Sequence, residues 1–356
     1  MSVSYGGDKI TFDDGTSIAS GLSHFRNRII NGAMEIDQRN AGSANTPSNQ
    51  NYTLDRWQCF LSGGGAYTVL QSNTAPTGFV NSLLVTTTTA DSSIAAGDYY
   101  IITHKIEGTN ISDLAWGSAS AKTVTLSFWV RSSLTGTFSG ALNNSDANRS
   151  YPFSYTISSG NTWEYKTITI AGDTTGTWLT TTGRGITLRL SLGMGSTYSG
   201  TANAWSASDF YATSSETAKV IGTLNATWQI TGVQLEVGSY ATTFERRPYG
   251  TELQLCQRYF QLLVNNSQSP AGFGNVDTSS AFQISIPTAV QMRGTPTYND
   301  STGRFRYNGN NITPSGYTVY AVNSNLLNLL ASTTGASLNY AGIFTVGVAT
   351  SLSAEL

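Results

Sequence analysis

This chain of 356 residues is poor in the side chains that most often carry catalysis or bind metals. It has 2 histidines, His24 and His104, and 2 cysteines, Cys59 and Cys256, which lie far apart in no metal-binding or redox spacing. We expect both cysteines to be free and buried, since an unpaired cysteine packs as a small hydrophobic residue. P-loop and serine-hydrolase motifs are missing as well. The sequence therefore predicts no catalytic residues, no metal site and no cofactor.

Charged residues are also scarce, at 11% of the chain with a net charge of −2. Nucleic-acid binding needs clustered lysine and arginine, so no nucleic-acid partner is expected. No apolar run reaches the roughly 18 residues of a membrane-spanning helix, and the first residues lack the basic and apolar parts of a secretory signal. We expect a water-soluble protein that folds in the cytoplasm, without membrane insertion.

Glycine (36 residues), serine, threonine and aromatic residues are abundant, a composition that favours strands joined by polar turns. Residues 122–133 alternate strictly, with Val124, Leu126, Phe128 and Val130 on one face. Similar strand signals recur at 97–108, 162–170, 185–194 and 226–238. Short alternating strands at this spacing predict an all-β protein built on a two-sheet sandwich, with Trp57 and Trp228 in its core.

The pattern divides the chain into four parts. Residues 1–25 form a short N-terminal β segment that is too small to fold alone. Residues 26–247 form the first sandwich, residues 248–263 a short linker helix, and residues 264–356 a smaller C-terminal β-sandwich. The pair Asn308-Gly309 predicts a two-residue hairpin in the last part. The segment 323–332 is ambiguous between helix and strand.

The linker helix is expected to begin with a capping box, Thr251 with Gln254. A stripe at steps of three, four and three residues follows it, formed by Leu253, Cys256, Phe260 and Leu263. This stripe favours one of two arrangements. The helix packs on its own sandwich, or three copies of the chain meet along the stripe as a trimer interface.

Several segments, in order, resemble a family of tailed-bacteriophage tail fibre and receptor-binding proteins. They are "DKITFDDGTS" near the start, "NRIINGAMEIDQRNAG" (27–42), "YTLDRW" (52–57), "TVTLSFWVRSS" (123–133), and the stretches 228–261 and 286–298. The resemblance implies a jelly roll of the carbohydrate-binding-module type in a homotrimeric virion fibre. It further implies attachment to a tail or baseplate protein through residues 1–25, and non-enzymatic adsorption to a bacterial surface glycan.

The stretch 27–42 carries Arg28 and Arg39 and is directly preceded by Arg26. We expect these arginines to pair with acidic side chains or carbonyl groups at the base of the sandwich. Asn31-Gly32 is expected to form a turn into a strand that places Met34 and Ile36 inward.

Glycan binding requires aromatic faces together with polar side chains that hydrogen-bond hydroxyl groups. The loop 140–155 supplies the candidates Asn143, Asn144, Asp146, Arg149 and Tyr151. The loop 198–211 adds Tyr198 and Trp205, and Trp205 is expected to be exposed among small polar residues.

Two other functions compete with glycan adsorption. One is a purely structural baseplate or decoration protein. The other is a polysaccharide depolymerase, which needs two carboxylates roughly 5–9.5 Å apart. The carboxylate candidates are Asp91, Asp98, Glu107, Asp113, Asp146, Glu164 and Asp209. Related sandwich modules often hold a structural calcium ion, for which the sequence assigns no ligands.

Overall fold

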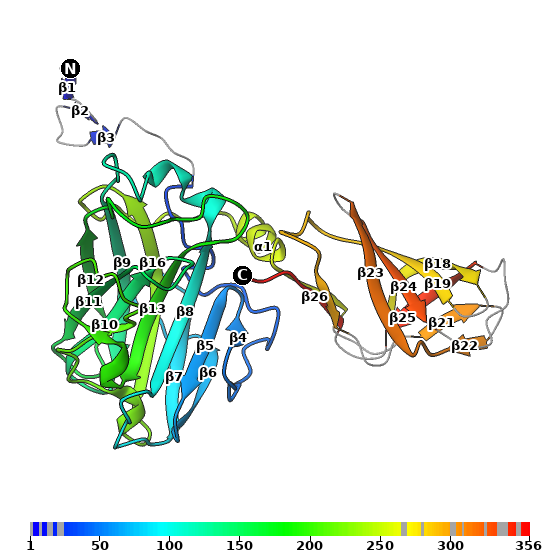
Figure 1. Ribbon diagram of the computed structural model, residues 1–356, viewed down its shortest axis with the longest axis horizontal. Coiled ribbons are helices and arrows are strands. Elements are labelled where there is room, and N and C mark those ends of the chain that lie inside the picture. Colours follow the sequence, from blue (N-terminus) through cyan, green and yellow to red (C-terminus); the bar gives the residue numbers. More distant parts are fainter. Residues whose placement is uncertain are drawn as a thin grey trace.

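The computed structural model describes residues 3–6, 9–12, 17–19, 25–264, 269–278, 281–299, 304–307, 310–323, 326–332, 341–346 and 350–356. These residues form two β-sandwiches with the helix α1 between them in the chain (Figure 1). The predicted all-β class, with two sandwiches joined by a short helix, is confirmed.

The first sandwich consists of a six-stranded and a five-stranded antiparallel sheet. The order in the first sheet is β11-β10-β13-β8-β5-β4, and in the second β12-β9-β16-β7-β6. The six strands are β4 (Asn51–Leu54), β5 (Trp57–Ser62), β8 (Tyr99–Glu107), β10 (Gly136–Asn143), β11 (Ser150–Ile157) and β13 (Arg184–Met194). The five are β6 (Ala66–Ser72), β7 (Ser82–Thr89), β9 (Val124–Ser132), β12 (Glu164–Ile170) and β16 (Thr227–Val237).

Short elements complete this sandwich. They are the 3₁₀ turns Gly108–Asn110, Ser112–Leu114, Ser196–Tyr198 and Val220–Gly222, and the parallel two-stranded pair β14 (Ser199–Gly200) and β15 (Ala212–Thr213). The strands alternate apolar and polar positions. The apolar positions of the two sheets face each other and form one large core. Trp57 and Trp228 are 0% exposed within it, as predicted.

The opening stretch turns where predicted but does not form a strand. Asn31 and Met34 both adopt positive φ angles, of 59° each, and no strand covers residues 33–38. The Asn31 side chain holds this turn, because its amide donates to the carbonyl oxygens of Ile36 (2.8 Å) and Asp55 (2.9 Å). Met34 and Ile36 are buried, so their inward orientation is confirmed even though the strand is not.

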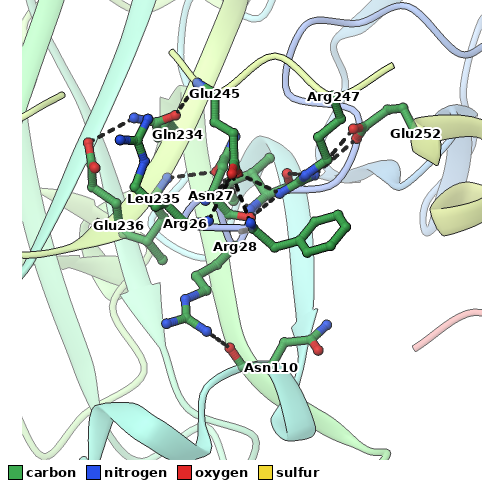
Figure 2. Close-up of polar contacts among 12 residues, drawn as sticks. Arg26, Asn27, Arg28, Asn110, Gln234, Leu235, Glu236, Glu245, Arg247 and Glu252 are labelled. Carbon is green, nitrogen blue, oxygen red and sulfur yellow. Dashed lines mark hydrogen bonds and ion pairs between the residues drawn. The ribbon is translucent and has the colours of Figure 1, made fainter. Parts of the chain in front are cut away.

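A polar network ties this opening stretch to the segment that follows β16 (Figure 2). The Glu245 carboxylate accepts the backbone N–H groups of residues 25, 26 and 27 at 2.8, 3.1 and 2.9 Å. Arg247 lies between Glu245 and Glu252, at 3.3 and 3.2 Å. The network joins two segments more than 200 positions apart in the chain.

The three arginines of the opening stretch are paired as predicted. Arg26 donates to the carbonyl oxygen of Thr243 at 3.2 Å. Arg28 donates to Asn110 O at 2.9 Å and forms an ion pair with Asp113 at 2.6 Å. Arg39 forms an ion pair with Glu355 at 2.7 Å. Their role in this structure is to close the sandwich.

The helix α1 spans Tyr249–Gln257 and is shorter than predicted. Pro248 occupies its N-cap position, and no side chain caps the helix, so the expected capping box is absent there. The next residues instead reach back to the first sandwich: Arg258 and the Tyr259 hydroxyl both donate to the Glu107 carboxylate, at 2.7–3.0 Å. These contacts end the helix before the predicted position.

The four residues of the predicted trimer stripe therefore do not lie on one helix, and this prediction is wrong. Phe260 and Leu263 lie on the strand β17 (Phe260–Val264) and not on α1. Cys256 is buried against Ile30, Ile36 and Tyr259 of the same chain, with Leu253 packed at the edge of that cluster. The helix therefore packs on its own sandwich. Cys59 and Cys256 are both free and buried, as expected.

The second sandwich packs a seven-stranded sheet against a three-stranded one. The larger sheet has the order β22-β21-β25-β18-β19-β24-β23 and the smaller β17-β26-β20. The remaining strands are β18 (Ser269–Thr278), β19 (Ala281–Pro287), β20 (Thr297–Asn299), β21 (Arg304–Tyr307), β22 (Asn310–Ile312), β23 (Gly316–Asn323), β24 (Leu326–Ser332), β25 (Ala341–Val346) and β26 (Thr350–Ser353).

Two local predictions in this region can be compared with the structure. The strands β21 and β22 pair as an antiparallel hairpin around positions 308 and 309, which lie outside the described residues. The ambiguous segment forms the strand β24. At the other end of the chain, β1 (Val3–Gly6), β2 (Lys9–Phe12) and β3 (Ser17–Ala19) form a three-stranded sheet, and His24 lies outside the described residues.

The last residues of the chain return to the first sandwich, and Figure 1 shows the C-terminal end beside it. After β26, the Glu355 carboxylate contacts both Arg39 and Arg56. The Arg56 side chain is only 1% exposed and its guanidinium also lies against the Tyr259 ring, at 3.6 Å from the ring centre. A buried guanidinium needs a paired carboxylate, so Glu355 couples the two sandwiches.

Replacing Glu355 by alanine should therefore destabilise the protein by about 3–5 kcal/mol, because Arg56 would keep its charge without a buried partner. The matched control is Asp113→Ala, which removes the partner of Arg28 from a pair whose carboxylate is 46% exposed. That change should cost less than about 1 kcal/mol. Urea unfolding of the two variants checks this, and equal losses would show that the Arg56–Glu355 pair does not hold the sandwiches together.

Candidate functional site

The outer face of the six-stranded sheet carries the most varied group of aromatic and charged side chains in the described part of the chain. Along β8, Tyr100, Ile102 and Ile106 belong to the core, so the alternate residues Tyr99, Ile101, Thr103 and Lys105 face outward. Strand pairing places Phe60 beside Ile101, and Arg189 beside Thr103. Residues on neighbouring strands thus share this side of the sheet, which we call the outer face, although Ile101, Thr103 and Lys105 on it are buried.

One end of the outer face is aromatic. The rings of Tyr198 and Tyr211 are stacked, with centres 4.6 Å apart and an interplanar angle of 6°. Tyr99 meets both rings edge-on, at 5.5 and 6.0 Å. Ile101, Met194, Ala212 and Phe60 pack beneath them. The three tyrosines are only partly buried, so each presents ring surface that a flat apolar face of a ligand can contact.

Arg189 lies next to this aromatic group. Its guanidinium is 3.7 Å from the centre of the Tyr211 ring and forms an ion pair with Asp209 at 3.2 Å. Asp209 also accepts from the Tyr211 hydroxyl (2.7 Å) and from the Asn143 amide (2.9 Å). Burial raises the pKa of Tyr211, so the phenol stays protonated and keeps donating. This set fixes the loop that carries Tyr211 against β10 and β13.

The other end of the outer face is cationic. Lys105 on β8 and Arg184 on β13 lie there, and burial, with the nearby charges of Arg184 and Arg56, lowers the pKa of Lys105 to about 8. The Lys105 ammonium donates to the backbone oxygen of Leu356, and Arg184 donates to the carbonyl oxygen of Ser145. Among the described residues, neither side chain forms an ion pair with an aspartate or glutamate, and the oxygen that Lys105 contacts belongs to the last residue of the chain.

The candidates from the loop 140–155 mostly build the loop itself. Asn144 is buried, donates to Asn148 and Thr177, and accepts the backbone N–H groups of positions 148 and 149. Arg149 makes a two-pronged contact with the buried Asp173, at 2.7 and 2.6 Å. Asn143 is buried behind Asp209, whereas Asp146 is exposed and contacts Ser145.

Trp205 differs from its expected exposure. Its indole nitrogen donates to the Ala171 carbonyl oxygen at 2.8 Å. Its ring packs edge-on against Trp116, Trp178 and Tyr151, at 5.3, 5.5 and 5.1 Å. Tyr151 itself is buried. Small polar neighbours in sequence suggested an open loop, but Trp205 is half-buried, because three aromatic rings from distant segments pack against it.

The structure thus brings Tyr198 and Asn143 to the outer face and places Asn144, Arg149, Tyr151 and Trp205 in the packing beside it. The candidates predicted from the sequence do not include Tyr211, Lys105, Arg184 or Arg189. The period-two pattern of "YYIITHK" and "RGITLRL" could have identified the last three of these residues, because it assigns the polar and aromatic positions to the face opposite the core.

The predicted carboxylates are each engaged in local contacts. Asp91 accepts from the Tyr100 hydroxyl, Asp98 from the backbone of Ala95, and Glu164 from Lys166. Burial pushes the pKa of Glu107 upward, but hydrogen bonds from Arg258 and Tyr259 outweigh this and hold the pKa below its usual range. Asp113 and Asp209 are paired with arginines.

Two hollows lie away from the outer face. One of about 700 Å³ is lined by Asp91, Lys219 and small polar residues at one end of the sandwich. The other, of about 100 Å³, lies at the polar network of Figure 2, beside Glu35, Glu245 and Glu252. Ligand pockets usually measure about 300–1,000 Å³, so the second is too small for a sugar.

No group of three or more His, Cys, Asp and Glu side chains in the described ranges is arranged to hold a metal ion. His104 lies on β8, and its Nε2 atom is 3.0 Å from the Ile30 carbonyl oxygen. No helix among the described residues has the length and apolarity needed to cross a membrane.

Comparison with known proteins gave matches among solved structures only: no family model and no curated protein matches the chain. One match is the enzymatically active domain of bacteriophage CBA120 tailspike protein 4 (TM-score 0.33, 14% identity, 61% of this chain, 22% of that one). Another is the family 11 carbohydrate-binding module of Clostridium thermocellum in complex with a β-1,3-1,4-mixed-linked tetrasaccharide (TM-score 0.29, 10% identity, 56% of this chain, 98% of that one). A third is a carbohydrate-binding module in complex with β-1,4-galactotriose (TM-score 0.26, 10% identity, 60% and 99%). The chain thus spans about a fifth of the tailspike domain that it matches.

Replacing Trp205 by alanine should lower the stability of the first sandwich by about 3 kcal/mol, since the indole contacts three aromatic rings. Thermal unfolding followed by tryptophan fluorescence and circular dichroism checks this. Tyr165→Ala, at a ring that is 43% exposed on the other sheet, is the control and should change the midpoint little. An unchanged midpoint for Trp205→Ala would show that the packing of the indole contributes little to stability. Trp205 would then again be a candidate for stacking on a sugar.

Proposed function

We propose that this protein is a non-enzymatic tail fibre component of a bacteriophage virion that adsorbs to a bacterial cell-surface glycan through the outer face. The observation that carries the proposal is the tyrosine group Tyr99, Tyr198 and Tyr211, held beside Arg189 and Asp209. Aromatic rings that stack on the C–H surface of a sugar, next to groups that bind its hydroxyls, are what a glycan site requires.

The assignment to a virion rests on the sequence resemblance to tail fibre and receptor-binding proteins. In that setting the N-terminal strands β1, β2 and β3 attach the fibre to a tail or baseplate protein. A homotrimer, which the resemblance implies, needs a contact surface other than the predicted stripe, because Cys256 and Phe260 are covered by their own chain. Three sites on one trimer would add avidity to weak single-site binding.

A non-enzymatic role is favoured because the carboxylates with a raised pKa, or their neighbours, are engaged in hydrogen bonds and ion pairs. A depolymerase needs an acid with a raised pKa opposite a second free carboxylate. Burial raises the pKa of Asp55, to about 6, but both of its oxygens accept from Gln38. Burial likewise raises the pKa of Glu35, yet its neighbours Glu245 and Glu252 are held by the backbone and by Arg247.

Size-exclusion chromatography with light scattering separates the three functions. The protein is mixed with purified bacterial surface polysaccharides, both acidic and neutral, and each component is also run alone. Co-elution with intact polysaccharide supports an adsorption protein. Polysaccharide shifted to smaller sizes points to a depolymerase, and no interaction with any polymer favours a structural baseplate or decoration protein. The protein mass in the same run tests the trimer.

Tyr198→Ala should weaken binding of the interacting polysaccharide by about tenfold, since it removes one face of the tyrosine stack. Tyr198→Phe keeps the ring and should retain most of the affinity. The control is Tyr240→Ala, at a ring that is 83% exposed and outside the outer face. Titration by calorimetry at equal folded fraction checks this, and equal affinities for Tyr198→Ala and Tyr240→Ala would exclude the tyrosine group as the binding surface.

A further inference from the structure

The hollow of about 700 Å³ at one end of the first sandwich has no role in the function proposed above. Three segments of the chain line it: residues 91–94 before β8, residues 133–135 between β9 and β10, and part of the segment 217–223 before β16. Its volume falls within the roughly 300–1,000 Å³ of ligand pockets. We call it the end hollow.

The lining of the end hollow has an apolar part and a part rich in hydroxyl groups. Ile94 and Leu134 are partly buried and pack against the core of the sandwich. Ser92, Thr135 and Thr223 are exposed, so their hydroxyl groups are accessible from solvent. A sugar ring is divided in the same way, because its C–H groups lie on the ring faces and its hydroxyls around the rim. The lining therefore offers apolar contact and hydrogen bonds to one ring at the same time.

The Asp91 carboxylate is held in the end hollow by a residue of the core. Tyr100 is 0% exposed, and its hydroxyl donates to Asp91 Oδ2 at 2.8 Å while accepting the backbone N–H of Gly65 at 2.8 Å. Burial raises the pKa of Tyr100 to about 12, so the phenol keeps its proton and continues to donate. The other Asp91 oxygen accepts the backbone N–H of Ser93 at 3.2 Å. A carboxylate accepts about four hydrogen bonds, so Asp91 is oriented and can still accept from a ligand.

Lys219 supplies donors to the same hollow. Its side chain is partly exposed, and its ammonium donates to the Met194 carbonyl oxygen at 2.9 Å, which leaves two of three donors. The nearby Glu216 carboxylate accepts from Ser139 at 2.7 Å. Within the described ranges Lys219 and Asp91 form no ion pair with each other. The end hollow thus presents a strong acceptor and a strong donor that do not satisfy one another.

We propose that the end hollow is a second glycan site, which takes one neutral sugar unit. Asp91 accepts from one hydroxyl of the sugar, and Lys219 donates to the oxygen of another. Ile94 and Leu134 contact the C–H groups of the ring. A neutral unit is favoured, because the charge of an acidic unit would be repelled by Asp91 as it is attracted by Lys219. The biological role of this site rests on the glycan adsorption proposed above.

The end hollow lies close to the tyrosine group along the chain. Ile94 lines the hollow, and Tyr99 follows it by five residues, which span at most about 18 Å when fully extended. Met194, whose carbonyl oxygen accepts from Lys219, packs with the tyrosine group. One glycan molecule of a few units can therefore reach both sites, and binding at one site would raise the effective concentration at the other.

The test uses saturation-transfer NMR titrations with the methyl glycosides of glucose, galactose and mannose. The starting protein is the Tyr198→Ala variant, in which the tyrosine group contributes less to binding. At least one glycoside should bind, and adding Asp91→Asn or Lys219→Met should weaken that binding by about tenfold, since each removes a charge-assisted hydrogen bond. The ring without hydroxyls, 2-methoxytetrahydropyran, should bind at least about tenfold more weakly than the glycoside.

The matched controls are Asp113→Asn and Lys122→Gln, which remove exposed charges outside the end hollow and should leave the affinity unchanged. Thr135→Val serves as a further variant, because Thr135 is exposed and its replacement does not disturb the core. It should weaken binding by about threefold through the loss of one hydroxyl. Thermal unfolding of every variant confirms an equal folded fraction during the titrations.

The outcomes separate this inference from the proposed function. Glycoside binding that survives Asp91→Asn and Lys219→Met would place the site elsewhere and overturn the inference, as would equal binding of 2-methoxytetrahydropyran. No binding of any glycoside would overturn it too, while co-elution with polysaccharide would still support adsorption through the tyrosine group. Glycoside binding that depends on Asp91 and Lys219, in a protein that binds no bacterial polysaccharide, would support the site and contradict the proposed function.

Discussion

The period-two alternation of β8 and β13 is the constraint on which both the core and the candidate site depend. The same two strands that bury Tyr100, Ile102 and Leu190 must present Tyr99, Thr103 and Arg189 on the opposite side. A shift of one residue in their register would put charges into the core and apolar side chains outside. The outer face is therefore as strongly determined as the core itself, although its side chains contribute less to stability.

Polar contacts, together with the apolar cluster of Ile30, Ile36, Cys256 and Tyr259, hold the distant parts of the chain to this sandwich. Glu245 and Arg247 tie the opening stretch to the end of β16, and Glu107 receives the residues that follow α1. Glu355 brings the last residues back to Arg56. Each carboxylate is matched with arginine or backbone donors in a setting with little water, where an unmatched charge would be strongly destabilising. This explains how so few charged residues suffice for a chain of this length.

The positively charged side chains differ in how they are partnered. Arg39 and Arg247 pair with carboxylates, whereas Lys105 and Arg184 have no aspartate or glutamate partner among the described residues. Lys105 and Arg184 lie on the face that also carries the tyrosine group, at its opposite end.

The sequence alone determined the fold class, the core tryptophans, the free cysteines and the pairing of Arg26, Arg28 and Arg39, because these depend on local alternation and on the cost of burying polar groups. The end of α1 at Gln257 was decided by tertiary contacts, since Arg258 and Tyr259 bind Glu107 from a strand about 150 positions away. The burial of Trp205 was likewise decided by Trp116, Trp178 and Tyr151, which no local pattern brings together. Lys105 and Arg184 lie on the same side of one sheet because β8 and β13 are neighbours in it, and strand order is set by long-range packing that a single sequence does not display.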